Sequence, residues 1–424
     1  MVIPLFSIFL TREINPICLQ SYKISHDNPL KNLIFFAVCA FFTTFGNGNQ
    51  KHYSLKYHLI SIFFILLPSL LNAQKITLGT CQTKDGGEYK GELVGGKPQG
   101  KGKTTYKNGN WYEGAYTKGK RQGYGVYTFF DGEKYEGQWF QDQQHGLGTY
   151  YFANNNKYEG LWFRDYQQGH GVMYYYNGDK YDGEWKQDHR NGKGTYTFAG
   201  GAYYKGEWMF DKKNGDGFFD WGDGSTYNGE WENNQRSGKG TFHYADGDVY
   251  IGQWQNDIQN GKGIYKFKNG DVYEGDYVEG ERTGTGIVRY ANGEKYTGSF
   301  VEGDKQGQGT LIWANGNVYT GEWKADKPNG TGKLTTKKGD VLEGQFKNGK
   351  IDGQGIVHYA DGWKFKGTFK DGKRNGPAIE EDKDGNRFEG SYLNDERDGR
   401  FVEKDRNGNI TAKGVYTRGR KKLD

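Results

Sequence analysis

Residues that could support metal binding are scattered along this chain and do not form the spacing that a site requires. The 424 residues include eight histidines and three cysteines. A zinc site needs His and Cys ligands at short, fixed separations, and no such spacing occurs. Five histidines fall in unrelated sequence contexts, namely His145, His170, His189, His243 and His358. We therefore expect no metal site.

Two further patterns resemble sites of chemistry but lack essential parts. Gly123-Tyr124-Gly125 and similar triplets lack the third glycine and the strand-to-helix context of a phosphate-binding loop. Asp216, Asp220 and Asp223 do not match a calcium loop, and turn formation explains them better. A catalytic carboxylate pair needs one unusual site, whereas each acidic position here has counterparts elsewhere in the chain. We expect no catalytic residue, no cofactor and no enzyme activity.

Aromatic side chains are the groups through which this chain could bind a ligand, since they form 17% of its residues. Exposed Trp and Tyr rings stack on sugars or anchor protein partners. The alternative, which we favour, is that the rings form the core of the fold. The candidate binding residues are Tyr135, Trp139, Tyr158, Trp162, Tyr181, Trp185, Trp208, Trp231 and Trp254.

These aromatic residues recur with a fixed period. The glycine of a Tyr-x-Gly motif returns every 23 residues, and a weaker fifteenth copy follows at Gly414. A constant period of this size indicates a repeat architecture. The fourteen regular positions are Gly91, Gly114, Gly137, Gly160, Gly183, Gly206, Gly229, Gly252, Gly275, Gly298, Gly321, Gly344, Gly367 and Gly390.

Each repeat contains two segments with the period-2 pattern of a β-strand. Tyr135, Gly137 and Trp139 are two residues apart, so a strand places them on one face, and polar residues fill the other face. Gly192, Gly194 and Tyr196 alternate with polar residues in the same way. The composition, with 69 Gly and only 34% hydrophobic residues, is too poor in aliphatic side chains for a two-layer core.

Turn-forming residues separate the predicted strands. Between the two strands of a repeat stands Gly, Asp or Asn, all of which tolerate left-handed backbone: Gly96, Gly119, Asp142, Asp165, Asp188, Asp211, Asn234, Asp257, Gly280, Gly303, Asp326, Gly349, Gly372 and Asp395. Between repeats, pairs such as Asn108-Gly109 and Asp131-Gly132 predict two-residue hairpin turns. We expect an all-β fold, an elongated single-layer antiparallel β-meander of about fifteen 23-residue hairpin repeats.

Glycine inside a strand normally weakens it, so these glycines need a packing reason. We expect Gly137 and Gly146 to leave space in which rings from adjacent strands lie flat and overlap. At ~4.8 Å per strand, thirty strands would form a ribbon roughly 140 Å long. Twist should bend it and give one aromatic-lined hollow.

The motif Tyr-x-Gly-x-Trp, a turn residue and Gly-x-Gly resembles the MORN (membrane occupation and recognition nexus) repeat, over residues 85–416. The resemblance implies a protein–protein interaction scaffold, in some members a homodimer, and the family name suggests membrane lipid. The pattern weakens near the C-terminus, where Phe346, Phe369 and Tyr392 replace Trp and Ala378 replaces a glycine. Terminal repeats that cap an array are expected to be atypical.

The first 74 residues do not belong to the repeat. Residues 55–74 have the basic start, apolar centre and small polar end of a signal peptide and resemble a bacterial one, with cleavage near Ala73 or Gln74. Residues 1–54 would then be a leader of uncertain status, and translation would start at Leu55. The alternative is a membrane anchor through residues 33–45 and 59–71, although both runs are short for a bilayer. The remaining boundaries that we predict are a linker at 75–84, the array at 85–418 and a tail at 419–424.

The net charge and the predicted export limit the classes of partner that this chain could bind. Residues 75–424 carry a net charge of only +2, which argues against nucleic acid, because a nucleic-acid binder shows a basic footprint. Basic residues do not form the continuous stripe that attachment to anionic lipid needs. We expect an exported, non-enzymatic scaffold of the cell envelope that binds a protein partner. A phospholipid surface, or a glycan stacked on the exposed rings, is the alternative.

Overall fold

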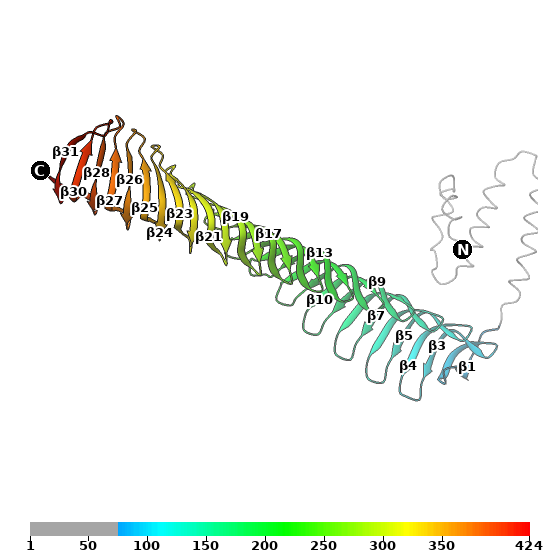
Figure 1. Ribbon diagram of the computed structural model, residues 1–424. Helices are drawn as coiled ribbons and strands as arrows, with labels where there is room; N and C mark the ends of the chain where they lie inside the picture. Colours follow the sequence, from blue (N-terminus) through cyan, green and yellow to red (C-terminus); the bar gives the residue numbers. More distant parts are fainter. Residues whose placement is uncertain (1–74) are drawn as a thin grey trace, which may run out of the picture. The chain divides into compact units, whose positions relative to one another are not determined.

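The computed structural model describes residues 75–424, which form one open antiparallel sheet of 32 strands (Figure 1). From β1 to β28 each strand pairs with the strands next to it in sequence, as β9 does with β8 and β10. The expected all-β, single-layer meander is confirmed. The predicted leader, signal peptide and membrane-anchor segments lie outside the described residues.

The strands alternate between two lengths along most of the sheet. The seven-residue strands are β2 (Glu88–Val94), β4 (Trp111–Thr117), β6 (Lys134–Phe140), β8 (Lys157–Phe163), β10 (Lys180–Lys186), β12 (Tyr203–Met209), β14 (Thr226–Glu232), β16 (Val249–Gln255), β18 (Val272–Val278), β20 (Lys295–Val301), β22 (Val318–Lys324), β24 (Val341–Lys347), β26 (Lys364–Lys370) and β28 (Arg387–Leu393). The nine-residue strands are β3 (Lys97–Thr105), β5 (Lys120–Thr128), β7 (Gln143–Tyr151), β9 (Tyr166–Tyr174), β11 (His189–Thr197), β13 (Lys212–Asp220), β15 (Gln235–His243), β17 (Ile258–Lys266), β19 (Glu281–Arg289), β21 (Asp304–Ile312), β23 (Lys327–Thr335), β25 (Lys350–His358) and β27 (Lys373–Glu381).

The two ends of the sheet depart from this alternation and correct two predicted boundaries. Residues 75–84, expected to be a linker, contain strand β1 (Thr77–Gln82), which pairs with β2. The expected tail 419–424 contains β32 (Arg420–Leu423), which pairs with β31 (Ile410–Thr417). Next to β28 lie β29 (Glu396–Arg397) and β30 (Gly399–Lys404). The aromatic motif does not mark β1 and β32, the two edge strands, which pair on one side only.

The two kinds of turn are placed differently from the prediction. The two-residue turn lies inside the repeat: Gln141 and Asp142 have φ of 49° and 73°, the two positive values of a type I′ turn. Asn108-Gly109 instead belongs to a three-residue loop between repeats. There the Tyr106 N–H donates to the Asn110 carbonyl at 2.9 Å and the Gly109 N–H to the Tyr106 carbonyl at 3.0 Å. Only the glycine of this pair is left-handed, so the loop is a type I turn followed by a bulge.

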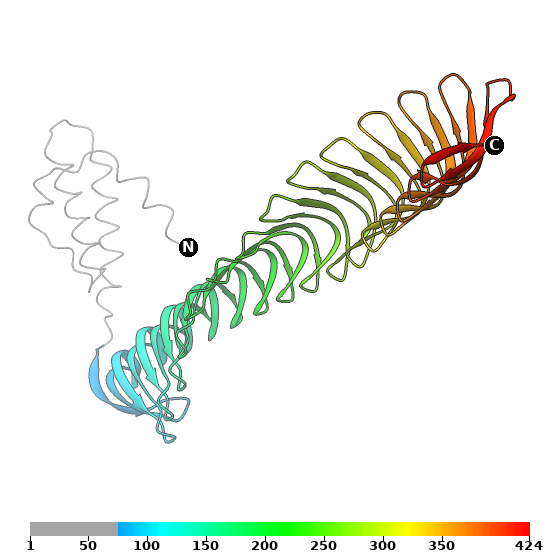
Figure 2. The ribbon, with the colours of Figure 1, turned by 90° about the vertical axis from the view of Figure 1, so that its left-hand side faces the viewer.

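The two glycines of Gly-x-Gly have different roles, which corrects the prediction for Gly146. The pairing shifts from Gly137–Gly148 to Trp139–Gln144, and Gly146, with φ of 63°, lies in the resulting bulge. Gly148 is the glycine that leaves space for a ring, because a Cβ there would lie 2.6 Å from Cε2 of Tyr135. Bulges bend a strand and increase its twist, which accords with the arched strands and the twisting ribbon of Figure 2.

The buried face carries two columns of rings along the ribbon. The Tyr column begins with Tyr89, Tyr112 and Tyr135 and the Trp column includes Trp139, Trp162 and Trp185. Tyr135 lies edge-on to Trp139 and to Trp162 of the next repeat, at 5.2 and 5.3 Å between ring centroids and 88° and 82° between planes. The expected flat overlap is therefore wrong: the rings alternate edge to face, the arrangement that their quadrupoles favour.

Within residues 75–424 the structure has no helix that is long and apolar enough to span a membrane.

Candidate functional site

The nine candidate binding residues all lie in the ring columns and are buried. Tyr135 is 0% exposed and Trp139 is 5% exposed, and the other seven have values of 0–7%. The polar atoms of the rings are also occupied: the Tyr135 hydroxyl donates to the Gln138 carbonyl at 2.9 Å, and Trp139 Nε1–H donates to the Gly125 carbonyl at 3.2 Å. These residues hold adjacent strands together, which is the core role that the sequence favoured.

A column of mostly basic residues lies over the Trp column, and sequence reasoning missed it. We call it the cation column. The Cζ atom of Arg190 lies 4.4 Å from the ring centroid of Trp208 and 5.4 Å from that of Tyr196. Its Nε donates to Asp211 Oδ1 at 3.1 Å and its Nη2 to the Asp211 carbonyl at 2.9 Å. Arg236 repeats this arrangement with Trp254 and Asp257.

Electrostatics favour the charged form of the Asp211 carboxylate. Burial alone would raise the pKa of Asp211, but hydrogen bonds from His189 and Arg190 hold that pKa below its ordinary value. For Lys213, which lies 3.9 Å from the Trp231 centroid, burial lowers the pKa to about 8. A cation in this column therefore depends on a carboxylate to offset its desolvation. Lys213 faces Asn234 in place of an aspartate.

At two positions of the cation column the residue is an uncharged glutamine, but the aspartate that pairs with the cation in other repeats is still present. The backbone N–H of Gln144 donates to Asp165 Oδ1 in the next turn at 2.7 Å. The backbone N–H of Gln167 donates to Asp188 Oδ1 in the same way, also at 2.7 Å. Within residues 75–424, neither aspartate forms an ion pair. The full column is Pro98, Arg121, Gln144, Gln167, Arg190, Lys213, Arg236, Gln259, Arg282, Lys305, Pro328, Ile351, Arg374 and Arg397.

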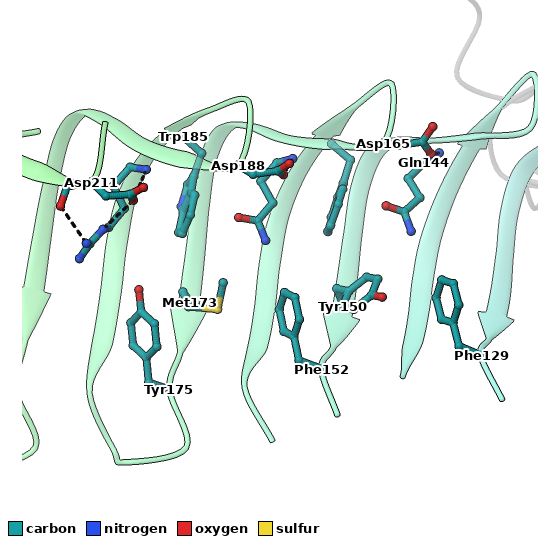
Figure 3. A pocket seen from close by; sticks show the side chains of 13 residues that line it. Phe129, Gln144, Tyr150, Phe152, Asp165, Met173, Tyr175, Trp185, Asp188 and Asp211 are labelled. Carbon is teal, nitrogen blue, oxygen red and sulfur yellow. Dashed lines mark hydrogen bonds and ion pairs between the residues drawn. The ribbon is translucent and has the colours of Figure 1, made fainter. Parts of the chain in front are cut away.

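A cavity of about 680 Å³ opens over these two positions. We call it the furrow. Figure 3 shows Gln144, Asp165 and Asp188 along one of its edges and Phe129, Phe152 and Tyr175 along the other. Tyr150 and Met173 also line the furrow, and Asp211, which binds Arg190, lies at one end.

The glutamine side chains that line the furrow lack partners in the part of the chain that the structure describes. Gln144 is 8% exposed and Gln167 is 5% exposed, yet neither side-chain amide hydrogen-bonds to any of residues 75–424. By contrast, Gln259 at the equivalent position donates to the Tyr244 hydroxyl at 3.0 Å. Both amides face the open furrow, so a ligand there could supply the hydrogen bonds that residues 75–424 do not. Arginine, lysine or glutamine recurring every 23 residues was the signal that could have revealed this column.

On the opposite face of the sheet some basic residues pair with acidic ones. Lys103 lies 3.6 Å from Glu113, Lys333 lies 2.8 Å from Glu343, and Lys262 pairs with Asp276. Two open hollows of about 670 and 730 Å³ lie on this face beside glycines that pair across neighbouring strands, such as Gly102 with Gly114 and Gly263 with Gly275. Lys90 and Lys101, which line one of these hollows, form no ion pair with any of residues 75–424.

The other residues singled out in the sequence have turn or surface roles. Asp220 accepts the Gly222 N–H, and Asp223 accepts the Ser225 N–H, each at 2.8 Å. His189 Nδ1 lies 2.6 Å from Asp211, and Cys81 is a half-buried thiol in β1. Over residues 75–424 no group of three or more His, Cys, Asp or Glu side chains is placed to hold a metal ion.

Comparison with known protein families identifies the family of the repeat array. The model of the MORN repeat matches thirteen consecutive segments within residues 89–387, more than half of the chain. The chain belongs to the MORN repeat family. Successive matches begin one residue after the previous match ends, except that Leu342 falls between two of them, where leucine replaces the tyrosine of the motif. The copies beyond residue 387, which the period predicts, are not matched.

Solved structures give only distant likenesses. The TCP10 domain of Danio rerio CPAP in complex with a peptide of Danio rerio STIL is 12% identical, with a TM-score of 0.28, over 64% of this chain and 100% of that chain. The SAS-4 (dCPAP) TCP domain of Drosophila melanogaster is 14% identical, with a TM-score of 0.26, over 42% and 89%. A streptogramin B lyase has a TM-score of 0.12 at 13% identity, over 63% and 89%. These scores carry no argument about this chain. No curated protein matches it.

Proposed function

We propose that this MORN array is a non-enzymatic scaffold of the cell envelope that binds a protein partner in the furrow. The observation that carries the proposal is a pair of glutamine amides that face the furrow, beside two aspartates, with no hydrogen bond or ion pair between these side chains and others of residues 75–424. At Arg190, Arg236 and Gln259 the corresponding side chains hydrogen-bond within the array. A local binding site on an otherwise uniform ribbon fits a scaffold that holds one partner at a fixed place along its length.

The two alternatives have less support. The nine candidate rings are buried in the core, so a glycan would reach them only if the sheet opened. Several basic residues of the opposite face form ion pairs, so electrostatic attachment to anionic lipid, worth ~1 kcal/mol per free basic residue, would be reduced. Both alternatives predict binding spread over many repeats, whereas the furrow predicts binding at one place.

Site-specific photo-crosslinking in the native host tests the proposal. A photoreactive residue at Phe152, on the edge of the furrow, should capture a protein. The same residue at Phe267, which begins the equivalent loop of a distant repeat, is the matched control and should capture at least tenfold less. Equal capture at both positions, or none at Phe152, would overturn the proposal. Deleting single repeats should likewise abolish binding abruptly at the furrow and hardly affect it elsewhere.

Export is the second part of the proposal and needs its own measurement. We expect the native protein to begin near Gln74 or Lys75 and to lie in the periplasm or outside the cell. N-terminal sequencing of the fractionated protein tests this expectation. A protein that retains residue 1 in the membrane fraction would instead favour the anchor through residues 33–45 and 59–71. The mass of the native protein in solution tests the predicted homodimer.

A further inference from the structure

We propose that the furrow binds two arginine side chains, three residues apart, in an extended segment of the partner. This inference rests on the proposed function and names the chemistry of its partner. Other repeats of the chain already contain arginine–aspartate contacts of this kind. In four repeats an arginine of the cation column binds the aspartate of the next turn. These pairs are Arg121–Asp142, Arg190–Asp211, Arg236–Asp257 and Arg374–Asp395.

Two repeats keep the acceptors of this arrangement and lack its cation. Asp165 and Asp188 retain the backbone hydrogen bond that fixes the carboxylate. Their carbonyl oxygens and Oδ2 atoms face no guanidinium, because glutamine is shorter and uncharged. A guanidinium has five N–H donors in a fixed fork. It can therefore satisfy the carboxylate, the carbonyl and the glutamine Oε1 together, which an ammonium group with its compact charge does less well.

Aromatic rings line the first position, whereas Met173 stands at the equivalent of Tyr196 in the second. The guanidinium of Arg190 lies between an aspartate and the half-buried Tyr196. Tyr150 occupies the position equivalent to Tyr196 beside Gln144 and Asp165, and Phe152 and Tyr175 line the same edge of the furrow. A guanidinium on an aromatic face gains cation–π attraction. The glutamine Nε2 groups are then free to donate to backbone carbonyls of the bound segment.

The spacing of the two positions sets the spacing of the arginines. Equivalent residues of adjacent repeats are two strands apart, about 9.6 Å at ~4.8 Å per strand. A polyproline II segment rises ~3.1 Å per residue, so residues three apart lie about 9.3 Å apart and point the same way. Arg121 and Arg190 already occupy the positions on either side, so the furrow takes two arginines and no more.

A synthetic peptide tests the inference by calorimetric titration of the full-length chain. The probe is the blocked hexapeptide Ala-Arg-Pro-Pro-Arg-Ala, for which we expect saturable binding below roughly 1 mM. The same peptide with citrulline, the neutral isostere of arginine, should bind at least tenfold more weakly. A peptide with one proline between the arginines should also bind more weakly. Raising the salt concentration should weaken the arginine peptide, because screening reduces exposed charge attraction.

Two double variants separate the ligand chemistry from the fold. Q144R/Q167R gives the furrow its own cations, as Arg121 and Arg190 do, and should lower peptide affinity at least tenfold while the protein melts no earlier than wild type. D165N/D188N removes the charge and keeps the turn, since Asn234 makes the same turn naturally, and should also lower affinity tenfold. Q259R is the matched control outside the furrow and should bind as wild type does.

The outcomes distinguish this inference from the proposed function. Equal binding of the arginine and citrulline peptides, or unchanged binding by folded Q144R/Q167R, would overturn the arginine assignment. Absence of peptide binding together with selective capture at Phe152 would also overturn it and leave the scaffold proposal standing. Loss of both results would overturn both.

Discussion

The regular repeats between Tyr135 and Trp254 and the C-terminal repeats between Leu342 and Tyr416 build the same ribbon with different cores. In the regular repeats the hydroxyls of the Tyr column and the N–H groups of the Trp column donate to backbone carbonyls, as Tyr135 and Trp139 do. In the C-terminal repeats Phe365 and Phe388 replace tyrosine and cannot donate, and Leu342 interrupts the Tyr column. Strand lengths remain seven and nine residues through β27 and β28.

Charged groups and aliphatic side chains fill the space that hydrogen-bonded rings occupy elsewhere. Glu380, 8% exposed, stands where the regular repeats have tyrosine or phenylalanine, and it binds Arg374, Arg397 and the Tyr392 hydroxyl. Ile351 and Ala378 are also buried there. The comparison teaches that glycines, bulges and turns fix the register of this sheet. Its core chemistry can therefore change from repeat to repeat.

The largest expected difference between the two regions is in their stability at alkaline pH. Burial raises the pKa of Tyr135 and Tyr158, and it raises the pKa of Tyr273 and Tyr319 to about 12. A phenol that stays neutral in the folded state but ionises near pH 10 when unfolded stabilises the fold below pH 10. That contribution is lost as pH rises from about 10 through the folded pKa. We expect the regular repeats to unfold cooperatively in this range, measured by phenolate absorbance and tryptophan fluorescence.

A variant that carries phenylalanine at Tyr135, Tyr158 and Tyr181 makes the regular repeats resemble the C-terminal ones. Its stability should fall less steeply above pH 10, because it releases three fewer protons on unfolding. Phenols that titrate at pH 10 while tryptophan fluorescence remains native would contradict the argument.

Removing the buried carboxylate should disrupt only the C-terminal region. Glu380→Ala removes the carboxylate that Arg374 and Arg397 share, and Arg374 keeps its contact with Asp395. Breaking a buried ion pair costs about 4 kcal/mol. Hydrogen exchange of amides in β27 and β28 should accelerate accordingly, while amides in β6 and β7 should not change. Glu113→Ala, which removes an exposed pair with Lys103, is the control and should cost less than about 0.5 kcal/mol. Equal effects of the two variants would show that the Glu380 cluster contributes nothing special.

The same glycine position should tolerate a methyl group in one region and not in the other. Gly148→Ala places a Cβ against the Tyr135 ring, and overpacking of this kind costs about 2–3 kcal/mol. At the equivalent C-terminal position alanine is native, so Ala378→Gly should cost about 1 kcal/mol. Denaturant unfolding of both variants measures the difference. A mild effect of Gly148→Ala would mean that the ring can shift.

Hydroxyl groups should give the smallest effects. Tyr135→Phe removes the hydrogen bond to the Gln138 carbonyl and should cost about 1 kcal/mol. Phe365→Tyr should not gain that amount, because Ala378 occupies the space that the hydroxyl needs. Adding Ala378→Gly should restore the gain, so the double-mutant cycle should show coupling between the two positions. Independent effects would contradict the proposed contact.

The sequence alone determined the architecture of this protein. The 23-residue period, the alternation of Tyr135, Gly137 and Trp139 and the turn residues such as Asp142 specify antiparallel strands in one layer, because each signal is local. They also specified which face is aromatic. The burial of the nine candidate residues agrees with the core role that composition favoured.

Only the tertiary structure decided how neighbouring repeats meet. The edge-to-face packing of Tyr135 on Trp162, the bulge at Gly146 and the placement of the two turns depend on pairing register, which no single repeat encodes. The furrow depends on it too. Gln144 looks unremarkable in its own repeat, and it becomes an unpartnered amide only because Asp165 and Trp162 of the next repeat lie against it. Period-2 patterning assigns a side chain to a face, but contacts across strands determine whether its polar atoms are satisfied.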